Sequence, residues 1–389
     1  MLNVCIVMPR FFPVPAVRGG AVEQLATFLA DESEKSHKIN LTFISVYDEL
    51  AIEASKKYKY SKFIYIPVKL KEEKYNYSKA DDVLIEYMHN VEKVISENDF
   101  DYVIIQGGRK EHIIPSIPFH KRITYLHGPT IEKGLHEYYK SVLVVSHFIA
   151  NCYYEQTDTP KECVIPLENA IHLEDFSKKI SENEKIKLRE QYHISKDDIV
   201  INFCGRTIAE KGVKELIQAF KQMQNVSKCK LLIMGNCNYA KQVHTPFEEE
   251  LFKLAEEMKD RIIFTGFVPN KELYKIHNIS DIAVIPSIFE EPFGLTVIEA
   301  MASGLPLITS DAGAIPDIVD DSNAIIVKRE DDFVNNLSIA LDKLSSDKTL
   351  REKMGKHSTK LVQNYDTPNY YNNFCQILYD IDKNNKNIN

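Results

Sequence analysis

The chain has 389 residues, 44% of them hydrophobic and 27% charged, which is the composition of a soluble globular protein with about two domains. Its formal net charge of -8 excludes the broad basic surface that nucleic-acid binding requires. The first apolar run is short and is interrupted by Pro9 and Arg10, so it predicts neither a signal peptide nor a membrane span.

Short apolar runs alternate with longer helix-like stretches along the chain. In the first half, the expected strands are Asn3–Met8, Leu41–Val46, Tyr102–Gln106, Ile123–Leu126, Val142–Val145 and Cys163–Ile165. In the second half, they are Ile199–Cys204, Lys230–Met234, Ile262–Thr265, Ile282–Ile285, Leu307–Thr309 and Ala324–Val327. Continuous apolar runs are typical of parallel strands that helices cover on both faces. The pattern predicts two doubly wound, Rossmann-like α/β domains.

The boundary between these domains is expected near a charged stretch. Residues 171–196 contain few large apolar side chains, and we interpret them as the linker region. We therefore expect an N-terminal domain over residues 1–175 and a C-terminal domain over residues 176–368. Apolar side chains recur at helical spacing near the end of the chain. Residues 369–382 are accordingly expected to form a helix that packs back on the N-terminal domain.

Cysteine usage and one lysine-rich stretch bear on the location of the protein. The seven cysteines include no C-x-x-C pair, and we interpret them as reduced thiols of a cytoplasmic protein. Residues 56–79 contain eight lysines interleaved with aromatic side chains. Such a stretch can contact a membrane, here its inner face, or an anionic lipid-linked molecule. The alternative is a solvated face whose lysines lie along apolar neighbours.

Three features of the first half lie next to expected strands. The loop with Gly19 and Gly20 does not have the G-x-G-x-x-G spacing, so it does not predict a dinucleotide site. Asp99 and Asp101 form a D-x-D pattern that precedes its strand, opposite the edge where ligands bind, and we interpret it as a solvated turn. No other cluster has metal-ligand spacing. His127 follows a strand, and both a structural role and a direct role remain open for it.

Two cations follow the first strand of the second half. Arg206 lies directly after that strand, and Lys211 precedes the glycine at which the next helix is expected to begin. A planar guanidinium and a point-charge ammonium both suit a diphosphate. The alternative is that both are ordinary surface cations.

The segment from Pro286 to Pro306 is the most informative part of the chain. A helix is expected to begin near Gly294, and its free N–H groups would form a site for a phosphate. Glu291 lies just before this helix. Glu299 lies within it among apolar neighbours, where an unpaired carboxylate is costly and needs hydrogen-bond donors. Sugar or ribose hydroxyls are suitable donors.

With Glu291 and Glu299 in the run E-P-F-G-L-T-V-I-E, the chain resembles the retaining glycosyltransferases of the GT4 family, also called glycosyl transferases group 1. The resemblance implies the GT-B fold, in which two Rossmann-like domains face each other across a cleft. It implies transfer of a sugar from a nucleoside diphosphate sugar, with UDP as the favoured carrier, to a hydroxyl of a glycan or lipid-linked acceptor. It also implies retention of configuration, no metal and no other cofactor.

The resemblance further assigns roles to individual residues. Arg206 and Lys211 would bind the donor diphosphate, Glu291 the donor sugar and Glu299 the ribose. His127 would lie near the transferred sugar, so that His127, Arg206, Lys211 and Glu291 form the catalytic set. The remaining donor-binding positions would be Gly19, Gly20, Phe267, Val268, Gly294, Leu295 and Thr296.

Two other functions are compatible with these motifs. A nucleotide-sugar epimerase of similar fold would change the sugar without an acceptor. A catalytically silent protein would bind the sugar nucleotide and transfer nothing. The intact set of Arg206, Lys211, Glu291 and Glu299 disfavours the silent protein. The expected setting of the transferase is surface polysaccharide or glycan biosynthesis. The sequence carries no signal for an oligomeric state.

Overall fold

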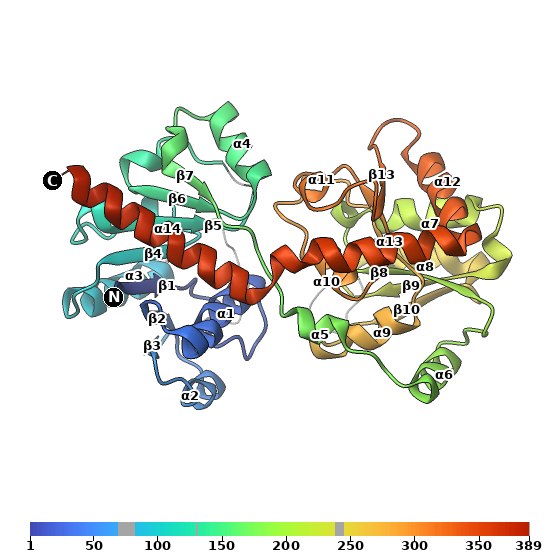
Figure 1. Ribbon diagram of the computed structural model, residues 1–389, viewed down its shortest axis with the longest axis horizontal. Coiled ribbons are helices and arrows are strands. Elements are labelled where there is room, and N and C mark those ends of the chain that lie inside the picture. Colours follow the sequence, from blue (N-terminus) through green and yellow to red (C-terminus); the bar gives the residue numbers. More distant parts are fainter. Residues whose placement is uncertain (69–81, 130, 238–244, 389) are drawn as a thin grey trace. The chain divides into compact units, whose positions relative to one another are not determined.

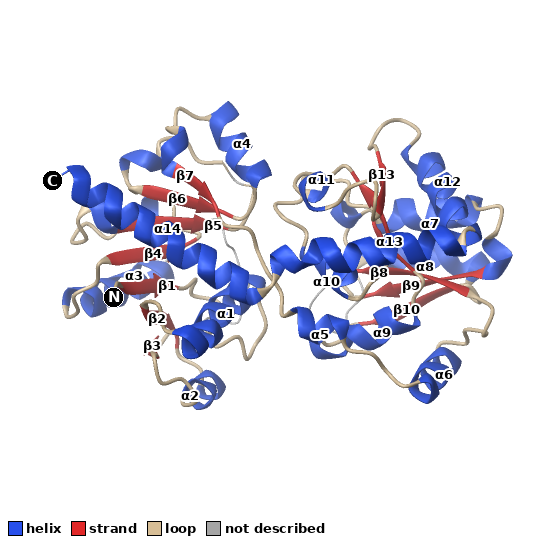
Figure 2. Ribbon diagram, in the orientation of Figure 1, coloured by secondary structure: helices blue, strands red, loops and turns tan. Residues whose placement is uncertain are grey.

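The computed structural model describes residues 1–68, 82–129, 131–237 and 245–388. The chain divides into two compact units (Figure 1). Unit 1 comprises Met1–Ala170 and Thr367–Asn389, and unit 2 comprises Ile171–Asp366. Each unit holds one parallel sheet with helices around it, as Figure 2 shows, which confirms the prediction of two Rossmann-like α/β domains.

The sheet of unit 1 has the strand order β3-β2-β1-β4-β5-β6-β7, and all its pairings are parallel. Its strands are β1 (Asn3–Val7), β2 (Asn40–Val46), β3 (Ser61–Ile66), β4 (Tyr102–Gln106), β5 (Arg122–Leu126), β6 (Ser141–Val144) and β7 (Val164–Pro166). Its α-helices are α1 (Ala21–Ser36), α2 (Glu49–Ser55), α3 (Asp82–Ser96), α4 (His147–Gln156) and α14 (Thr367–Ile388). β2 and β3 lie on one side of β1, and β4 to β7 lie on its other side. The order in which strands are added therefore reverses between β1 and β4.

The sheet of unit 2 has the order β10-β9-β8-β11-β12-β13 and is also parallel throughout. Its strands are β8 (Ile199–Cys204), β9 (Cys229–Met234), β10 (Ile262–Gly266), β11 (Ile282–Ile285), β12 (Leu307–Ser310) and β13 (Ala324–Val327). Its α-helices are α5 (Leu173–Ser177), α6 (Glu182–Gln191), α7 (Val213–Gln222), α8 (Pro246–Ala255), α9 (Leu273–Ile279), α10 (Leu295–Ala302), α11 (Ile315–Ile318), α12 (Phe333–Ser346) and α13 (Lys348–Leu361). The corresponding reversal lies between β8 and β11.

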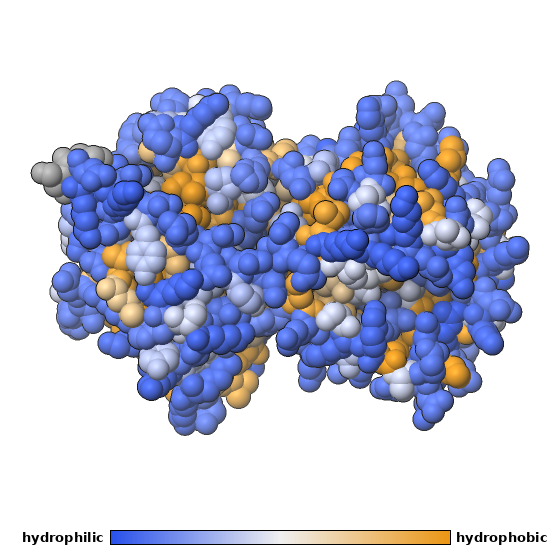
Figure 3. All heavy atoms as spheres, in the orientation of Figure 1, coloured by the Kyte–Doolittle hydropathy of each residue, from blue (hydrophilic) through white to orange (hydrophobic). Residues whose placement is uncertain are grey.

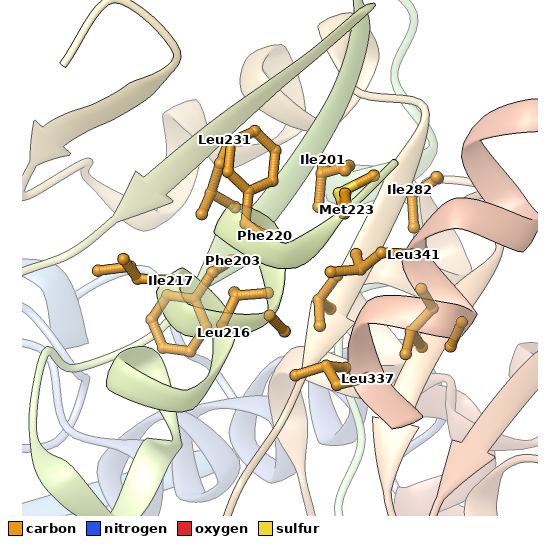
Figure 4. Close-up of a cluster of buried hydrophobic side chains, with 14 of the residues drawn as sticks. Ile201, Phe203, Leu216, Ile217, Phe220, Met223, Leu231, Ile282, Leu337 and Leu341 are labelled. Atoms are coloured by element: carbon orange, nitrogen blue, oxygen red, sulfur yellow. The ribbon is translucent and has the colours of Figure 1, made fainter. Parts of the chain in front are cut away.

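The core of unit 2 explains why its strands are continuous apolar runs. Side chains of β8 such as Ile201 and Phe203 pack against Leu216 and Phe220 of α7 and Leu341 of α12 (Figure 4). Each of these side chains is at most 3% exposed. Full burial of such a side chain stabilises the fold by about 1.5–3 kcal/mol relative to leaving it exposed. The packing of these side chains therefore fixes the position of α7 against β8.

The structure moves the expected domain boundary and fills the expected linker. Ile171 pairs with Asp366, and α5 packs against α9 and α10, so residues 171–175 belong to unit 2 and not to the N-terminal unit. The segment 171–196 also forms α5 and α6. Its charge had suggested a linker because α6 is a surface helix without a buried face.

The terminal helix α14 belongs to unit 1 and is longer than the expected 369–382. It packs against α1, and the Thr367 hydroxyl donates to a Glu32 carboxylate oxygen at 2.9 Å. The Tyr371 hydroxyl accepts from the Lys38 backbone N–H at 3.1 Å. The chain therefore crosses between the units twice, once before Ile171 and once after Asp366.

Part of the lysine-rich stretch forms β3, an edge strand that the sequence patterns did not predict. Residues 69–79 of that stretch lie outside the described residues. Before β3, a Glu34 carboxylate accepts the backbone N–H groups of Lys59, Tyr60 and Ser61, and Lys57 pairs with Asp31 at 3.1 Å. The visible face in Figure 3 is mostly hydrophilic with dispersed apolar areas. Within the described ranges, no helix is long and apolar enough to cross a membrane.

Candidate functional site

The candidate site lies at the carboxyl edge of the sheet in unit 2. β8 and β11 are neighbours in this sheet, but the chain leaves them toward opposite ends of the strand order. In open parallel sheets, ligands bind outside the carboxyl ends of the strands at such a reversal. The loops after β8 and β11, residues 205–212 and 286–294, flank this point.

A glycine allows these two loops to touch. Gly212, the N-cap of α7, has a φ of 70°, and an added Cβ there would lie 1.9 Å from the carbonyl oxygen of Pro286. Only glycine fits this close approach in the left-handed region. The backbone N–H of Ile288 also donates to the carbonyl of Glu210 at 2.9 Å. The loops after β8 and β11 are therefore locked together.

This contact places a cation against an acid. The Lys211 ammonium lies 2.6 Å from Glu291 Oε1, and the Ser287 hydroxyl donates to the same oxygen at 2.5 Å. The Lys211 ammonium also stands over the ring of Phe289, 4.8 Å from its centre. Glu291 is only 6% exposed, so its charge is held by a matched cation and a hydroxyl. Two predicted site residues, separated by 80 positions, thus share one contact.

Arg206 follows β8 on a fixed stretch of backbone. The neighbouring Thr207 is buried, and its hydroxyl donates to Glu248 Oε1 at 2.5 Å. The same oxygen accepts the backbone N–H of Cys237, after β9, at 2.8 Å. The Arg206 side chain is exposed and forms no ion pair with any residue that the structure describes. Its guanidinium is therefore available to an anionic ligand.

The N-terminus of α10 adds uncompensated N–H groups to the same edge. Its N-cap, Gly294, has a φ of 115° and provides no side-chain cap, and the first turn contains no acid. The first N–H groups of the helix, at Leu295 and Thr296, have no helical acceptor. Together with the helix dipole, they favour an anion at this point.

Glu299 projects from the body of α10 and, unlike Glu291, has no partner among the residues that the structure describes. It is 8% exposed, and its carboxylate forms no hydrogen bond or ion pair with a described residue. Burial raises its pKa to about 7. The Cys204 thiol lies at the end of β8, next to the reversal point. Burial raises the pKa of this thiol, and the charge of Glu299 raises it further, so Glu299 lies nearby. A ligand with hydroxyl donors would satisfy this acid.

Phe267 and Val268 lie farther along the same edge, directly after β10. Gly266 turns the chain with a φ of 69°, and Phe267 is 45% exposed while Val268 is partly buried. β10 is separated from β8 only by β9. An exposed aromatic ring at this position offers a flat apolar surface.

The three predicted residues of the N-terminal half lie at the carboxyl edge of the sheet in unit 1. His127 Nε2 is 2.6 Å from Gln106 Oε1, so this nitrogen donates an N–H and the other ring nitrogen is an acceptor. Burial lowers the pKa of His127 to about 3, which makes the ring neutral at physiological pH. Gly19 and Gly20 have φ values of 84° and 96°. Their predicted position opposite the donor-binding residues of unit 2 stays a prediction.

The D-x-D pattern lies where the sequence places it, at the amino edge of the unit 1 sheet. The Asp101 carboxylate accepts the backbone N–H of Asn3, the first residue of β1, at 2.7 Å, and Asp99 is 3.5 Å from Lys121. Among the described residues, no three His, Cys, Asp or Glu side chains form a group that could hold a metal.

Several residues that shape the site escaped the sequence patterns. Ser287 and Thr207 are short hydroxyl side chains without a motif, and Arg329 lies after β13, far along the chain. Glu248 carried a signal, because Thr245 and Glu248 form a capping box at the start of α8. This T-x-x-E spacing is a signal for a helix start, which the sequence predictions above did not use, and it carries no information about the bond to Thr207.

Comparisons with known proteins agree with this geometry. Residues 184–361, within unit 2, match the family model described as glycosyl transferases group 1. The uncharacterized glycosyltransferase MJ1607 of Methanocaldococcus jannaschii is 30% identical over 206 residues, 53% of this chain and 50% of that protein. The lipopolysaccharide 1,2-N-acetylglucosaminetransferase of Salmonella typhimurium is 26% identical over 237 residues, 60% of each. The chain thus spans half to three fifths of the length of these two relatives.

The fold is shared over nearly the whole chain. Anabaena Alr3699/HepE, solved in complex with UDP and glucose, has a TM-score of 0.73 at 14% identity, and the match covers 97% of this chain and 100% of that one. The two parallel-sheet α/β units have the architecture of GT-B glycosyltransferases. The family model and the two relatives show that this part of the chain is similar to glycosyltransferases.

Proposed function

We propose that the chain is a retaining GT4-type glycosyltransferase that moves a sugar from a nucleoside diphosphate sugar to a hydroxyl of a glycan or lipid-linked acceptor. One observation carries the proposal: Lys211 and Glu291 meet at 2.6 Å beside the N-terminus of α10, at the strand reversal of unit 2. That point combines groups for a diphosphate with an acid for a sugar. The resemblance of the run around Glu291 and Glu299 supports the same assignment.

In the proposed reaction, the acceptor oxygen forms a bond to the anomeric carbon while the bond from that carbon to the diphosphate oxygen breaks. Negative charge develops on the departing diphosphate. Arg206, Lys211 and the N–H groups of Leu295 and Thr296 would stabilise it because their positions are fixed beforehand. The acceptor hydroxyl would lose its proton to the departing phosphate, on the face from which the leaving group departs. Such a reaction retains the configuration and needs no metal.

The remaining residues would bind the donor. Glu291 would accept hydroxyls of the donor sugar, and Glu299 would accept the ribose hydroxyls that its unpaired carboxylate lacks. Phe267 and Val268 would contact the nucleobase. His127 is neutral at physiological pH, so its role would be to orient a sugar hydroxyl by a hydrogen bond.

UDP is the proposed carrier, supported by the fold neighbour solved with UDP and by the resemblance. Surface polysaccharide or glycan assembly is the proposed setting, supported by the relative that is named a lipopolysaccharide N-acetylglucosaminetransferase. The structure as described places none of the seven cysteines in a disulfide, which supports a reducing compartment. Contact with the inner face of a membrane through the lysine-rich stretch is part of the proposal.

A thermal-shift screen with nucleotide sugars tests the donor, because a ligand that binds only the folded state raises the melting temperature. The best donor is then incubated with candidate acceptors, and release of nucleoside diphosphate and the anomeric configuration of the product are measured by NMR. Transfer with retention supports the proposal. Conversion of the donor sugar without an acceptor would instead identify an epimerase, and donor binding without any turnover would identify a silent binding protein.

A further inference from the structure

Arg329 follows β13 and joins three loops at the carboxyl edge of unit 2. Its Nε donates to Asp311 Oδ1, after β12, at 2.9 Å. Its Nη2 donates to Glu290 Oε1, after β11, at 2.9 Å, and its Nη1 reaches the carbonyl of Ile288 at 3.4 Å. The planar fork of an arginine can hold two carboxylates in fixed directions at once. One side chain thus ties the ends of β11, β12 and β13 together.

The loop after β12 in turn holds the backbone of Glu291. The backbone N–H of Gly313 donates to Glu290 Oε2 at 2.6 Å, and that of Ala314 donates to the Glu291 carbonyl at 2.9 Å. Gly313 has a φ of 54°, and an added Cβ there would lie 2.3 Å from the Glu291 carbonyl oxygen. The turn of residues 288–291 is therefore held both by Arg329 and by the backbone N–H groups of Gly313 and Ala314.

The solvent exposure of these side chains separates an effect on global stability from an effect on the local turn. The side chains of Arg329, Glu290 and Asp311 are 23%, 51% and 37% exposed. Ion pairs with this much solvent contact add little to global stability. The Glu291 carboxylate, in contrast, is buried, and Glu291 directly follows Glu290 in the turn that Arg329 contacts.

We propose that Arg329 is a positioning residue of the donor site, which holds the turn of residues 288–291 through Glu290 and Asp311 so that Glu291 can accept the donor sugar. The role of Glu291 in this inference rests on the proposed function. Arg329 itself does not need to touch the donor. Replacing Arg329 should therefore loosen the turn and weaken recognition of the sugar, while binding of the diphosphate persists.

The first test measures native-state hydrogen exchange in the peptides that cover residues 286–294 and 311–315. In Arg329→Ala, exchange of the amides of Ile288, Gly313 and Ala314 should be about tenfold faster than in the parent chain. Arg329→Lys keeps the charge but loses the fork, and it should give an intermediate rate. Lys328→Ala is the matched control, because Lys328 is 73% exposed and its contact with Glu330 is long, at 3.9 Å. It should change neither exchange nor the melting temperature.

The second test compares two affinities in each variant by calorimetry. The probes are UDP-glucose and UDP, replaced by the best donor of the thermal-shift screen and its diphosphate if that donor is different. The gain in affinity that the sugar adds over the diphosphate should fall about tenfold in Arg329→Ala and stay unchanged in Lys328→Ala. A merely structural role would instead weaken both ligands equally or lower the melting temperature.

Unchanged exchange in Arg329→Ala would overturn the proposal, whatever the activity of the chain. Faster exchange with an unchanged sugar contribution would overturn it as well, because the turn would then not matter for the donor. If the parent chain binds no nucleotide sugar, the proposed function fails. In that case, the exchange result alone decides whether Arg329 holds the turn.

Discussion

The two sheets have the same order over their first strands, but their strand-end loops differ. In unit 1, Gly19 and Gly107 have positive φ values, and no atom lies within 4 Å of the Cβ that either lacks. In unit 2, the missing Cβ atoms of Gly212 and Gly313 would meet a carbonyl oxygen of a neighbouring loop at 1.9 and 2.3 Å. Gly266 is an open exception in unit 2. In unit 1, an added Cβ at Gly20 would lie 2.0 Å from Glu23 Oε2, which is a side-chain atom of helix α1 and not the backbone of a neighbouring loop. The loops at the reversal of unit 2 interlock through backbone contacts, whereas added Cβ atoms at Gly19 and Gly107 of unit 1 would meet open space.

This difference shows that the topology fixes where a ligand can bind but not what can bind. Interlocked loops hold charged groups in set directions, as Lys211 and Glu291 show, and preset charges suit a leaving group whose charge develops during reaction. Open backbone lets a ligand approach closely but provides no charge of its own. The same fold thus supports a fixed polar site in one unit and an accommodating surface in the other.

The largest expected effect comes from adding the missing Cβ in each unit. Gly212→Ala should lower the free energy of unfolding by about 3–5 kcal/mol, because the left-handed conformation and the clash with Pro286 add. Gly107→Ala should cost only about 1–2 kcal/mol, since its Cβ meets open space. Urea denaturation measures both values. Equal losses in the two variants would contradict the contrast between interlocked and open loops.

Substitutions of Arg206 and Lys211 should have similar effects on the rate of transfer but different effects on stability. Arg206→Ala should slow transfer about 10²- to 10³-fold and leave stability unchanged, because Arg206 is exposed and forms no ion pair with the described residues. Lys211→Ala should slow transfer similarly and also cost about 2 kcal/mol of stability, because the buried Glu291 loses its cation. Steady-state rates and urea denaturation check these outcomes. Loss of stability in Arg206→Ala would show that this guanidinium has a structural partner.

Each unit contains a buried acid whose pKa is raised to about 7, Glu23 in α1 and Glu299 in α10. Burial is the main cause in both. A raised folded pKa means that stability is highest below the unfolded value of 4.5 and falls as pH rises to about 7. Each acid can contribute a decrease of at most about 3 kcal/mol. Glu23→Gln and Glu299→Gln should each remove part of this decrease, as urea denaturation at pH 4.5 and 7.5 would show.

Nucleotide binding distinguishes the two acids. If ribose hydroxyls bind the charged Glu299, the donor should bind more tightly as pH rises toward 7.5 and should release a proton on binding. Calorimetry in buffers of different ionisation enthalpy measures that proton. Glu299→Gln should abolish the release, and Glu23→Gln, the matched control in unit 1, should leave it unchanged. Proton release that survives in Glu299→Gln would contradict this role.

The sequence predicted the strands of unit 2 well because each is a buried apolar run bounded by polar loops. It did not predict β3, since the lysine-rich stretch in which that edge strand lies resembles a solvated segment. In the site, Lys211 and Glu291 were assigned by resemblance to one ligand, and the structure adds that they contact each other. Arg329 was beyond reach, because its contacts depend on three loops that are adjacent only in the folded sheet.

The smallest expected effect concerns His127 in unit 1. Its ring is neutral down to about pH 3, so between pH 5 and 8 it should add no inflection to the pH dependence of transfer. His127→Ala should slow transfer about 2- to 10-fold, because a neutral hydrogen bond contributes about 0.5–1.5 kcal/mol. The pH–rate profile is measured in the Glu299→Gln background, which removes the acid of the proposed donor site that titrates near 7. A loss above 100-fold, or an inflection near pH 6.5 that disappears in His127→Ala, would show that unit 1 provides a charged catalytic group after all.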